Sequence, residues 1–178
     1  MRSLLTLLLS VTVCNAQSTP PTPPAMGNFV YIDQIGNNNN IVVYQEDSDQ
    51  KRAAIFNAGD SNDLSIVQQG MGNHTALIGP SVNNTTSYNN SNILNILQQG
   101  AGNHTASIML ADPVSNSNNT ASITQKGGVG ANKQFTLQIQ GNGIGATVIQ
   151  DNLTVPDSGT MSIQCLTPPC SGYSYTKH

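Results

Sequence analysis

Apolar and polar residues alternate in short runs along most of the chain between residues 29 and 155, and the runs are separated by Gly and Asn. Alternation with a period of two predicts β-strands, because successive strand side chains point to opposite faces. The clearest runs are the near-copies Leu64–Thr75 (LSIVQQGMGNHT) and Leu94–Thr105 (LNILQQGAGNHT). We interpret each as a strand, a Gly/Asn turn and the start of another strand. No segment beyond residue 16 shows a convincing helical period.

The spacing of the near-copies continues outside them. Anchor positions fall eleven or twelve residues apart, which is the length of one strand plus one turn, at Gln34, Gln45, Asn57, Gln68 and Gly79. Such a repeat predicts a stack of strand–turn–strand units about 4.8 Å apart. The expected fold is therefore all-β, a β-solenoid with a cross-β, amyloid-like architecture.

Stacking would place residues of equal offset in columns. We expect an inward column of amides, in which each side chain donates to one neighbour and accepts from the other, so that only the column ends lack partners. The repeat assigns to this amide ladder Gln34, Gln45, Asn57, Gln68, Gln98, Gln125 and Gln150. A further inward column would include Thr75 and Thr105, while Val67, Gln69, Ala76 and Ile78 would point outward.

Turns are predicted wherever Gly and Asn interrupt the alternation, because both residue types accept a positive φ. These positions are Gly36, Asn39, Gly59, Asn62, Gly70, Asn73, Gly100 and Asn103. The charged stretch Glu46–Arg52 is interpreted as a solvated turn that separates two strands.

Four regions follow from these patterns. Residues 1–16 resemble a secretory signal peptide, since Arg2 precedes an apolar run (Leu4–Val13) too short to span a bilayer. Acylation of Cys14, as in a lipoprotein, is the alternative, although Val13 fits that motif poorly. Residues 17–28 form a Pro-rich leader, residues 29–155 the repeat domain, and residues 156–178 a last strand, a cysteine loop and a tail. The expected location is extracellular.

Composition supports a polar, associating β-structure. Charged residues make up only 8% of the chain, against roughly 25% in ordinary soluble domains, and there is no Trp. Low charge with abundant Asn and Gln is typical of amide ladders and β-association. A net charge of −3 with six Lys and Arg residues provides no basic patch for nucleic acid.

Few residues suggest a catalytic or metal-binding site. His74 and His104 share one offset, and we interpret them as solvent-facing rather than metal-binding, because two histidines alone are a thin ligand set. Neither a calcium loop nor a Ser/His/Asp order is present. Cys165 and Cys170 flank a short loop and predict a local disulfide that acts as a terminal cap. We expect no enzyme activity, no metal, no cofactor and no small-molecule substrate.

The anchor spacing resembles the curlin repeat, whose signature is close to S-x5-Q-x-G-x-x-N-x-A-x3-Q. One unit keeps the Gln, Gly, Asn, Gln spacing in full, at Gln34, Gly36, Asn39 and Gln45. Two units keep its first half, at Gln68, Gly70 and Asn73 and at Gln98, Gly100 and Asn103. The resemblance implies a secreted subunit that assembles into curli-type amyloid fibres for adhesion and biofilm matrix. Its partners would be copies of itself, other curlin subunits, a dedicated secretion pore and chaperones.

A different function remains open. The long connectors and the Cys165–Cys170 loop also suit a soluble, capped β-solenoid whose flat face binds a surface, a glycan or ice. This binding module would need a regular outward row of Thr or aromatic residues, which the predicted outward positions do not show.

Overall fold

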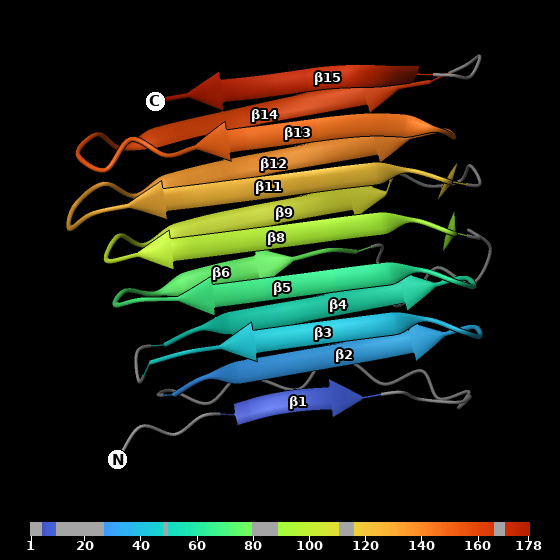
Figure 1. Ribbon diagram of the computed structural model, residues 1–178, viewed down its shortest axis with the longest axis horizontal. Coiled ribbons are helices and arrows are strands. Elements are labelled where there is room, and N and C mark those ends of the chain that lie inside the picture. The colour runs from blue at the N-terminus through green and yellow to red at the C-terminus, as the bar shows by residue number, and fades with distance from the viewer. Residues whose placement is uncertain (1–4, 10–26, 48–49, 80–88, 111–115, 166–169) are drawn as a thin grey trace.

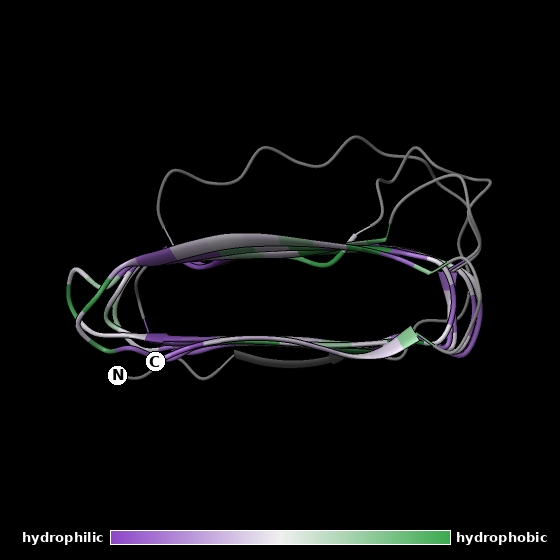
Figure 2. Ribbon diagram, turned by 90° about the horizontal axis from the view of Figure 1, so that it is seen from above, coloured by the Kyte–Doolittle hydropathy of each residue, from purple (hydrophilic) through white to green (hydrophobic). Residues whose placement is uncertain are grey.

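Alternating side chains produce two flat parallel sheets that face each other across one core, and the chain winds between them as a β-solenoid (Figure 1). The computed structural model describes residues 5–9, 27–47, 50–79, 89–110, 116–165 and 170–178. Seen along the stack, the strands superpose on two sides of a flattened ring (Figure 2). The described residues include no helix with the length and hydrophobicity of a membrane span.

Sheet A has seven strands and sheet B has six. Sheet A contains, in spatial order, β1 (Leu5–Leu9), β3 (Asn40–Gln45), β5 (Asp63–Gln69), β8 (Ile93–Gly100), β11 (Thr120–Gly127), β13 (Ile144–Gln150) and β15 (Cys170–Lys177). Sheet B contains β2 (Phe29–Ile35), β4 (Arg52–Ala58), β6 (His74–Leu77), β9 (His104–Leu110), β12 (Lys133–Gln140) and β14 (Asp157–Gln164). A small pair joins β7 (Asn89–Asn90) to β10 (Asn116–Ser117).

Every strand pair is parallel except β1 with β3. The register places like residues above one another, as when Leu64 pairs with both Ile41 and Leu94. Sheet A thus contributes a continuous apolar column of Val43, Ile66, Ile96, Ile123 and Val148. Its members are all buried, because each is covered by the next rung and by the opposite sheet.

Two expected side-chain orientations are wrong. Thr75 and Thr105 are exposed, whereas Ala76 and Ile78 are buried in the core. The cause is a difference between the two kinds of turn. Asn39 follows its turn glycine by three residues and points inward, but Asn73 follows Gly70 by three residues and is exposed. A shift of one residue exchanges the faces of the strand that follows, so a single repeat frame cannot describe both sheets.

The two ends of the stack differ. At the N-terminal end, β1 runs antiparallel along β3, while β2 has no outer neighbour within the part of the chain that the structure describes. At the C-terminal end, β14 and β15 have no outer neighbours among the described residues. Residues 173–178, expected to be a tail, belong largely to β15, which pairs in register with β13. Tyr175 of β15 packs on Phe135 with ring centroids 4.9 Å apart.

Most of the predicted signal and leader lies outside the described residues. Only Leu5–Leu9 of the signal segment is described, as β1, together with Gly27 and Asn28 of the Pro-rich leader.

Candidate functional site

A ladder of buried glutamines runs up sheet A. Each glutamine donates from Nε2 to Oε1 of the glutamine on the next rung, over 2.8 to 3.0 Å. The members, from the N-terminal end, are Gln45, Gln68, Gln98, Gln125 and Gln150. All are at most 5% exposed, so the amides satisfy one another instead of binding water.

The second N–H of each amide joins the two sheets. Nε2 of Gln68 donates to the carbonyl of Arg52 in sheet B over 2.9 Å, and Gln98 and Gln125 do the same to Thr75 and Thr105. These bonds cross the narrow edge of the solenoid, where each sheet A strand ends. The alternation within the strand places each glutamine there, as the last inward residue before the turn.

The Gln ladder has two different ends. At the N-terminal end, Oε1 of Gln45 is buried and receives no hydrogen bond from any described residue. At the C-terminal end, Gln150 donates to Oδ2 of Asp157 over 2.8 Å. Lys177 Nζ lies 2.9 Å from the other carboxylate oxygen, and the Tyr175 hydroxyl lies 3.3 Å from it.

Asp157 is buried, yet it stays a strong acceptor. Burial alone would raise the pKa of its carboxyl group, but hydrogen bonds from Lys177, Gln150 and Tyr175 and the Lys177 charge outweigh burial. The pKa of Asp157 is therefore lower than its ordinary value, and the ladder ends on a carboxylate.

The expected single amide column is wrong for Asn57. Asn57 lies in sheet B, paired in register with Gln34, and its Oδ1 accepts a hydrogen bond from Asn62 over 3.2 Å. It therefore does not bond to Gln68, which belongs to sheet A. The side chain of Gln34 lies outside the described residues. Anchors eleven or twelve residues apart alternate between sheets, so they form two columns rather than one.

A second ladder, of asparagines, lines the opposite edge. Oδ1 of Asn39 accepts from the backbone N–H and from Nδ2 of Asn62, both over 2.9 Å. Oδ1 of Asn62 accepts from the same two groups of Asn92, and Oδ1 of Asn92 accepts from the N–H of Asn119. These side chains are buried, so Asn39 and Asn62 act through amide bonds rather than through a positive φ.

Asn92 and Asn119 were not predicted as site residues, although the sequence carries a signal for them. Each precedes its strand in the pattern Asn-x-apolar-x-apolar-x-Gln, which also describes the strands after Asn39 and Asn62. The long segment before Asn92 obscured this equivalence. Asn73 and Asn103 belong to the other kind of turn and are exposed, with Oδ1 of Asn103 accepting from the N–H of Asn73.

The predicted turn glycines all take a positive φ. The values are 120° for Gly36, 135° for Gly59, 94° for Gly70 and 103° for Gly100. Close stacking adds a second requirement, since a Cβ on Gly100 would lie 2.0 Å from the carbonyl oxygen of Gly127 on the next rung. Gly36, Gly70 and Gly100 therefore require glycine both for backbone conformation and for space.

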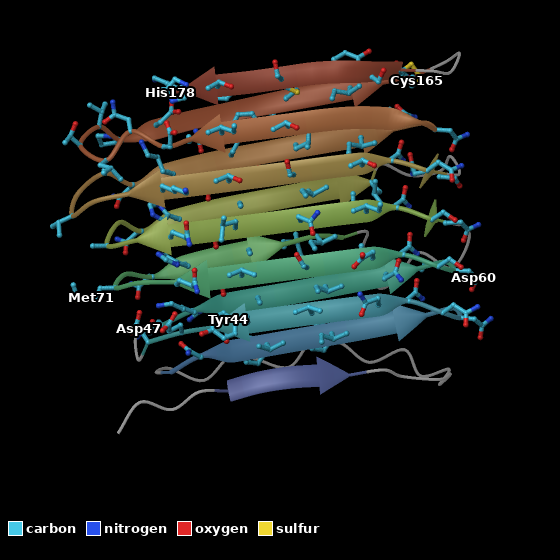
Figure 3. The ribbon with its side chains drawn as sticks, viewed as in Figure 1. Tyr44, Asp47, Asp60, Met71, Cys165 and His178 are labelled. Atoms are coloured by element: carbon cyan, nitrogen blue, oxygen red, sulfur yellow. A yellow bond between two sulfur atoms is a disulfide. The ribbon has the colours of Figure 1, made fainter. Side chains whose placement is uncertain are left out.

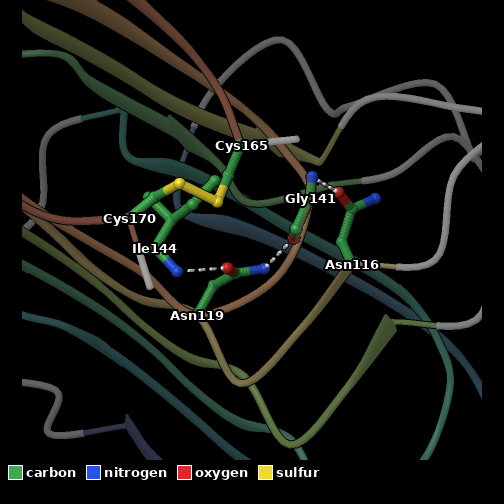
Figure 4. Close-up of a disulfide and its surroundings, with 6 residues drawn as sticks. All are labelled: Asn116, Asn119, Gly141, Ile144, Cys165 and Cys170. Carbon is green, nitrogen blue, oxygen red and sulfur yellow. Dashed lines mark hydrogen bonds between the residues drawn. A yellow bond between two sulfur atoms is a disulfide. The ribbon is translucent and has the colours of Figure 1, made fainter. Parts of the chain in front are cut away.

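A disulfide closes the end of the Asn ladder. Cys165, after β14, is bonded to Cys170 at the start of β15, with their Cα atoms 5.8 Å apart. Figure 4 shows the pair above Ile144, which replaces asparagine on this rung and donates its N–H to Oδ1 of Asn119 over 2.8 Å. Nδ2 of Asn119 donates to the carbonyl of Gly141.

A column of basic residues is buried where sheet B strands begin. It consists of Lys51, His74, His104 and Lys133, each at most 1% exposed. The solvent-facing interpretation of both histidines is therefore wrong, and Lys51 does not belong to a solvated turn. Lys51 donates to the carbonyl of Gly70 over 2.7 Å, and Nε2 of His104 lies 3.0 Å from that of Gln99.

The two imidazoles stack with centroids 4.8 Å apart and planes 26° apart. Burial lowers the pKa of His74 from 6.5 to about 4, helped by the charges of His104 and Lys51. Burial also lowers the pKa of His104, and Lys133 acts in the same direction. Both rings are therefore neutral near pH 7.

Among the described residues, no group of three or more His, Cys, Asp or Glu side chains is arranged so that it could hold a metal ion. The chain matches no protein-family model, no curated protein and no solved structure. The candidate site consists of two buried amide ladders and a basic column, which extend over four or five successive rungs of a repeat β-solenoid.

Proposed function

We propose that the protein is a secreted structural subunit, similar to curlins, that stacks end to end into an extracellular cross-β fibre for adhesion and biofilm matrix. The observation that carries this proposal is the Gln ladder, an unbroken series of five glutamines along sheet A. The last strand of this sheet, β15, has no outer neighbour among the described residues. The curlin-like spacing of three of these glutamines, Gln45, Gln68 and Gln98, supports it.

The physical argument concerns the open edges. β2, β14 and β15 each present a row of backbone donors and acceptors without a strand partner among the described residues. Addition of another rung pairs this row and extends every column at once, as in cross-β assembly. A buried amide column becomes more favourable with length, because its unsatisfied ends are shared among more rungs.

The test is a fibrillation assay on purified protein. Gln68→Ala combined with Gln98→Ala removes two adjacent rungs of the ladder, and we expect the lag phase of thioflavin binding to lengthen or fibres to fail to form. The matched control is Gln69→Ala with Gln99→Ala, which removes the outward amide pair joined over 2.7 Å. A parent protein that stays monomeric for days at high concentration contradicts the proposal.

A capped binding module is the second candidate, favoured by two observations. The disulfide and the Asp157–Lys177 ion pair finish the C-terminal end differently from the other rungs. Thr75 and Thr105 stack in register on the outer face of sheet B. This candidate predicts a stable monomer in analytical ultracentrifugation that binds ice or a glycan, with binding reduced by Thr105→Val.

A further inference from the structure

The two ends of the solenoid expose the interior of the core. The apolar side chains that are only partly buried against the core lie in the end rungs: Val30 and Ile32 at the N-terminal end, and Met161, Cys170 and Tyr175 at the C-terminal end. Every other rung is covered on both sides. Each end is therefore an apolar surface framed by strand edges, which needs a cover of the same shape.

The N-terminal end lacks a donor. Oε1 of Gln45 is the acceptor at which the Gln ladder begins, and no described residue donates to it. Glu46 follows on the outer face, where it accepts from Nε2 of Gln69 over 3.2 Å. This end thus presents two acceptors: the unused amide oxygen of Gln45, which faces the interior of the solenoid, and the carboxylate of Glu46, which lies on its outer face.

The C-terminal end supplies donors at the same two column positions. Lys177 pairs in register with Gln150 and therefore occupies the ladder column. Its side chain is 53% exposed, and its ammonium group has three N–H donors, of which the Asp157 contact uses one. His178 follows on the outer face, 2.6 Å from Asp151.

We propose that a second copy of the chain docks head to tail on the first. Strand β14 of the second copy pairs with β2 of the first, and β15 pairs with β3. Strand β15 thereby takes the place that β1 occupies beside β3 in the intact chain. Continuing the register puts Lys177 of one copy beside Gln45 of the next, and His178 beside Glu46. Tyr175 then meets Val43, and Met161 meets Ile32, so apolar ends cover each other. The inference rests on the proposed fibre function and gives the fibre its direction.

Head-to-head docking fits less well. β3 does accept an antiparallel strand, since β1 pairs Leu7 with Val43. Two β3 strands paired antiparallel about Val43 would place Gln45 beside Ile41, which offers no side-chain donor. The Gln45 acceptor would stay unsatisfied, and both Glu46 side chains would lie without a basic partner. The parallel join satisfies both positions and continues the strand direction of the other rungs.

Removal of β1 is a condition of this join. β1 pairs along Ile41–Gln45, which is the same stretch of β3 that the incoming β15 requires. The intact chain therefore covers its own docking edge on sheet A, and separation of the first residues from the rest of the chain frees it.

Paired cysteine variants test the join. Tyr44 and Thr176 lie at opposite ends of one outward column of sheet A. Figure 3 shows Tyr44 far along the stack from His178, which follows Thr176 by two residues. Head-to-tail docking brings them about 4.8 Å apart in neighbouring copies, within reach of a disulfide. We would mix full-length Tyr44→Cys and Thr176→Cys proteins, each with a specific protease site inserted between residues 17 and 26. Val67→Cys, one rung further from the join, is the control partner for Thr176→Cys.

After cleavage, fibres should yield the Tyr44→Cys/Thr176→Cys heterodisulfide on mild oxidation, at least ten-fold more than the Val67→Cys control or the uncleaved mixture. Fibres that give only homodisulfides would overturn the head-to-tail direction and leave the fibre function standing. Equal heterodisulfide yield before cleavage would overturn the role of β1. If thioflavin and electron microscopy reveal no fibres after cleavage, the proposed function itself fails, and this inference fails with it.

Discussion

Acid should destabilise the solenoid through the stacked pair His74 and His104. Both rings are fully buried, and the backbone groups of Gly100 and Gly102 near His74 only partly offset the effect of burial on its pKa. A proton on either ring would add a charge to a buried column that already holds Lys51 and Lys133. The folded state therefore resists protonation at a pH where the unfolded chain accepts it.

The size of the effect follows from the pKa of His74, which is 6.5 in an ordinary environment and about 4 in the folded chain. Between these pH values the unfolded state binds more protons than the folded state, so stability is fullest above pH 6.5 and falls as the pH drops toward 4. At roughly 1.36 kcal/mol for each pH unit, the loss from His74 alone is about 3 kcal/mol. The lowered pKa of His104 adds to the loss in the same direction.

The assay is denaturant unfolding at pH 7, 6, 5 and 4.5, followed by circular dichroism at concentrations too low for association. Asp157 does not interfere, because its lowered pKa places its own loss of stability below its ordinary value of 3.8. We expect His74→Leu with His104→Leu to flatten the decline, whatever its effect at pH 7. His178→Leu is the control, since that ring is 74% exposed. A double variant that declines as steeply as the parent, or an NMR titration that gives His74 a pKa above 6, would refute the reasoning.

Two further predictions concern the turns and the end of the stack. Gly100→Ala should lower the melting temperature by far more than Gly130→Ala. Both positions have a positive φ, but only a Cβ at residue 100 would meet a carbonyl oxygen, that of Gly127, at 2.0 Å. Equal shifts in differential scanning calorimetry would show that stacking space does not matter at Gly100. Cys165→Ser with Cys170→Ser should cost about 2 kcal/mol in denaturant unfolding, as expected for so short a loop, and reductant should reproduce that loss in the parent but not in the variant.

The strands and the Gln ladder could be predicted because both depend on short-range periodicity. The two-residue alternation identifies Gln68 and Gln98 as inward, and equal offsets imply that they stack, as their 2.9 Å bond shows. The sheet to which each residue belongs was harder to predict. Gln68 and Asn57 share the repeat frame yet lie in different sheets, because the frame covers half a turn of the solenoid.

The basic column could not be predicted, because it depends on the register of a single turn. The turn after Gly70 places Asn73 on the outer face, and because side chains alternate along the strand, His74 faces inward. Lys51 follows charged residues in the sequence, which predicts a solvated side chain. Its side chain is instead buried, and its ammonium group donates to the carbonyl of Gly70. Asn92 was within reach of prediction, since its strand repeats the pattern that follows Asn62.

The two amide ladders have opposite directions, and this has an electrostatic consequence. The Gln side chains donate toward the C-terminal end, whereas Asn92 donates to Asn62 and Asn62 donates to Asn39, toward the N-terminal end. Aligned amide dipoles add along a column, as they do along a helix. Because these two columns are antiparallel, the dipoles of the shorter Asn column partly offset those of the Gln column across the width of the stack. A longer stack therefore accumulates a smaller potential between its ends than the Gln ladder alone would produce.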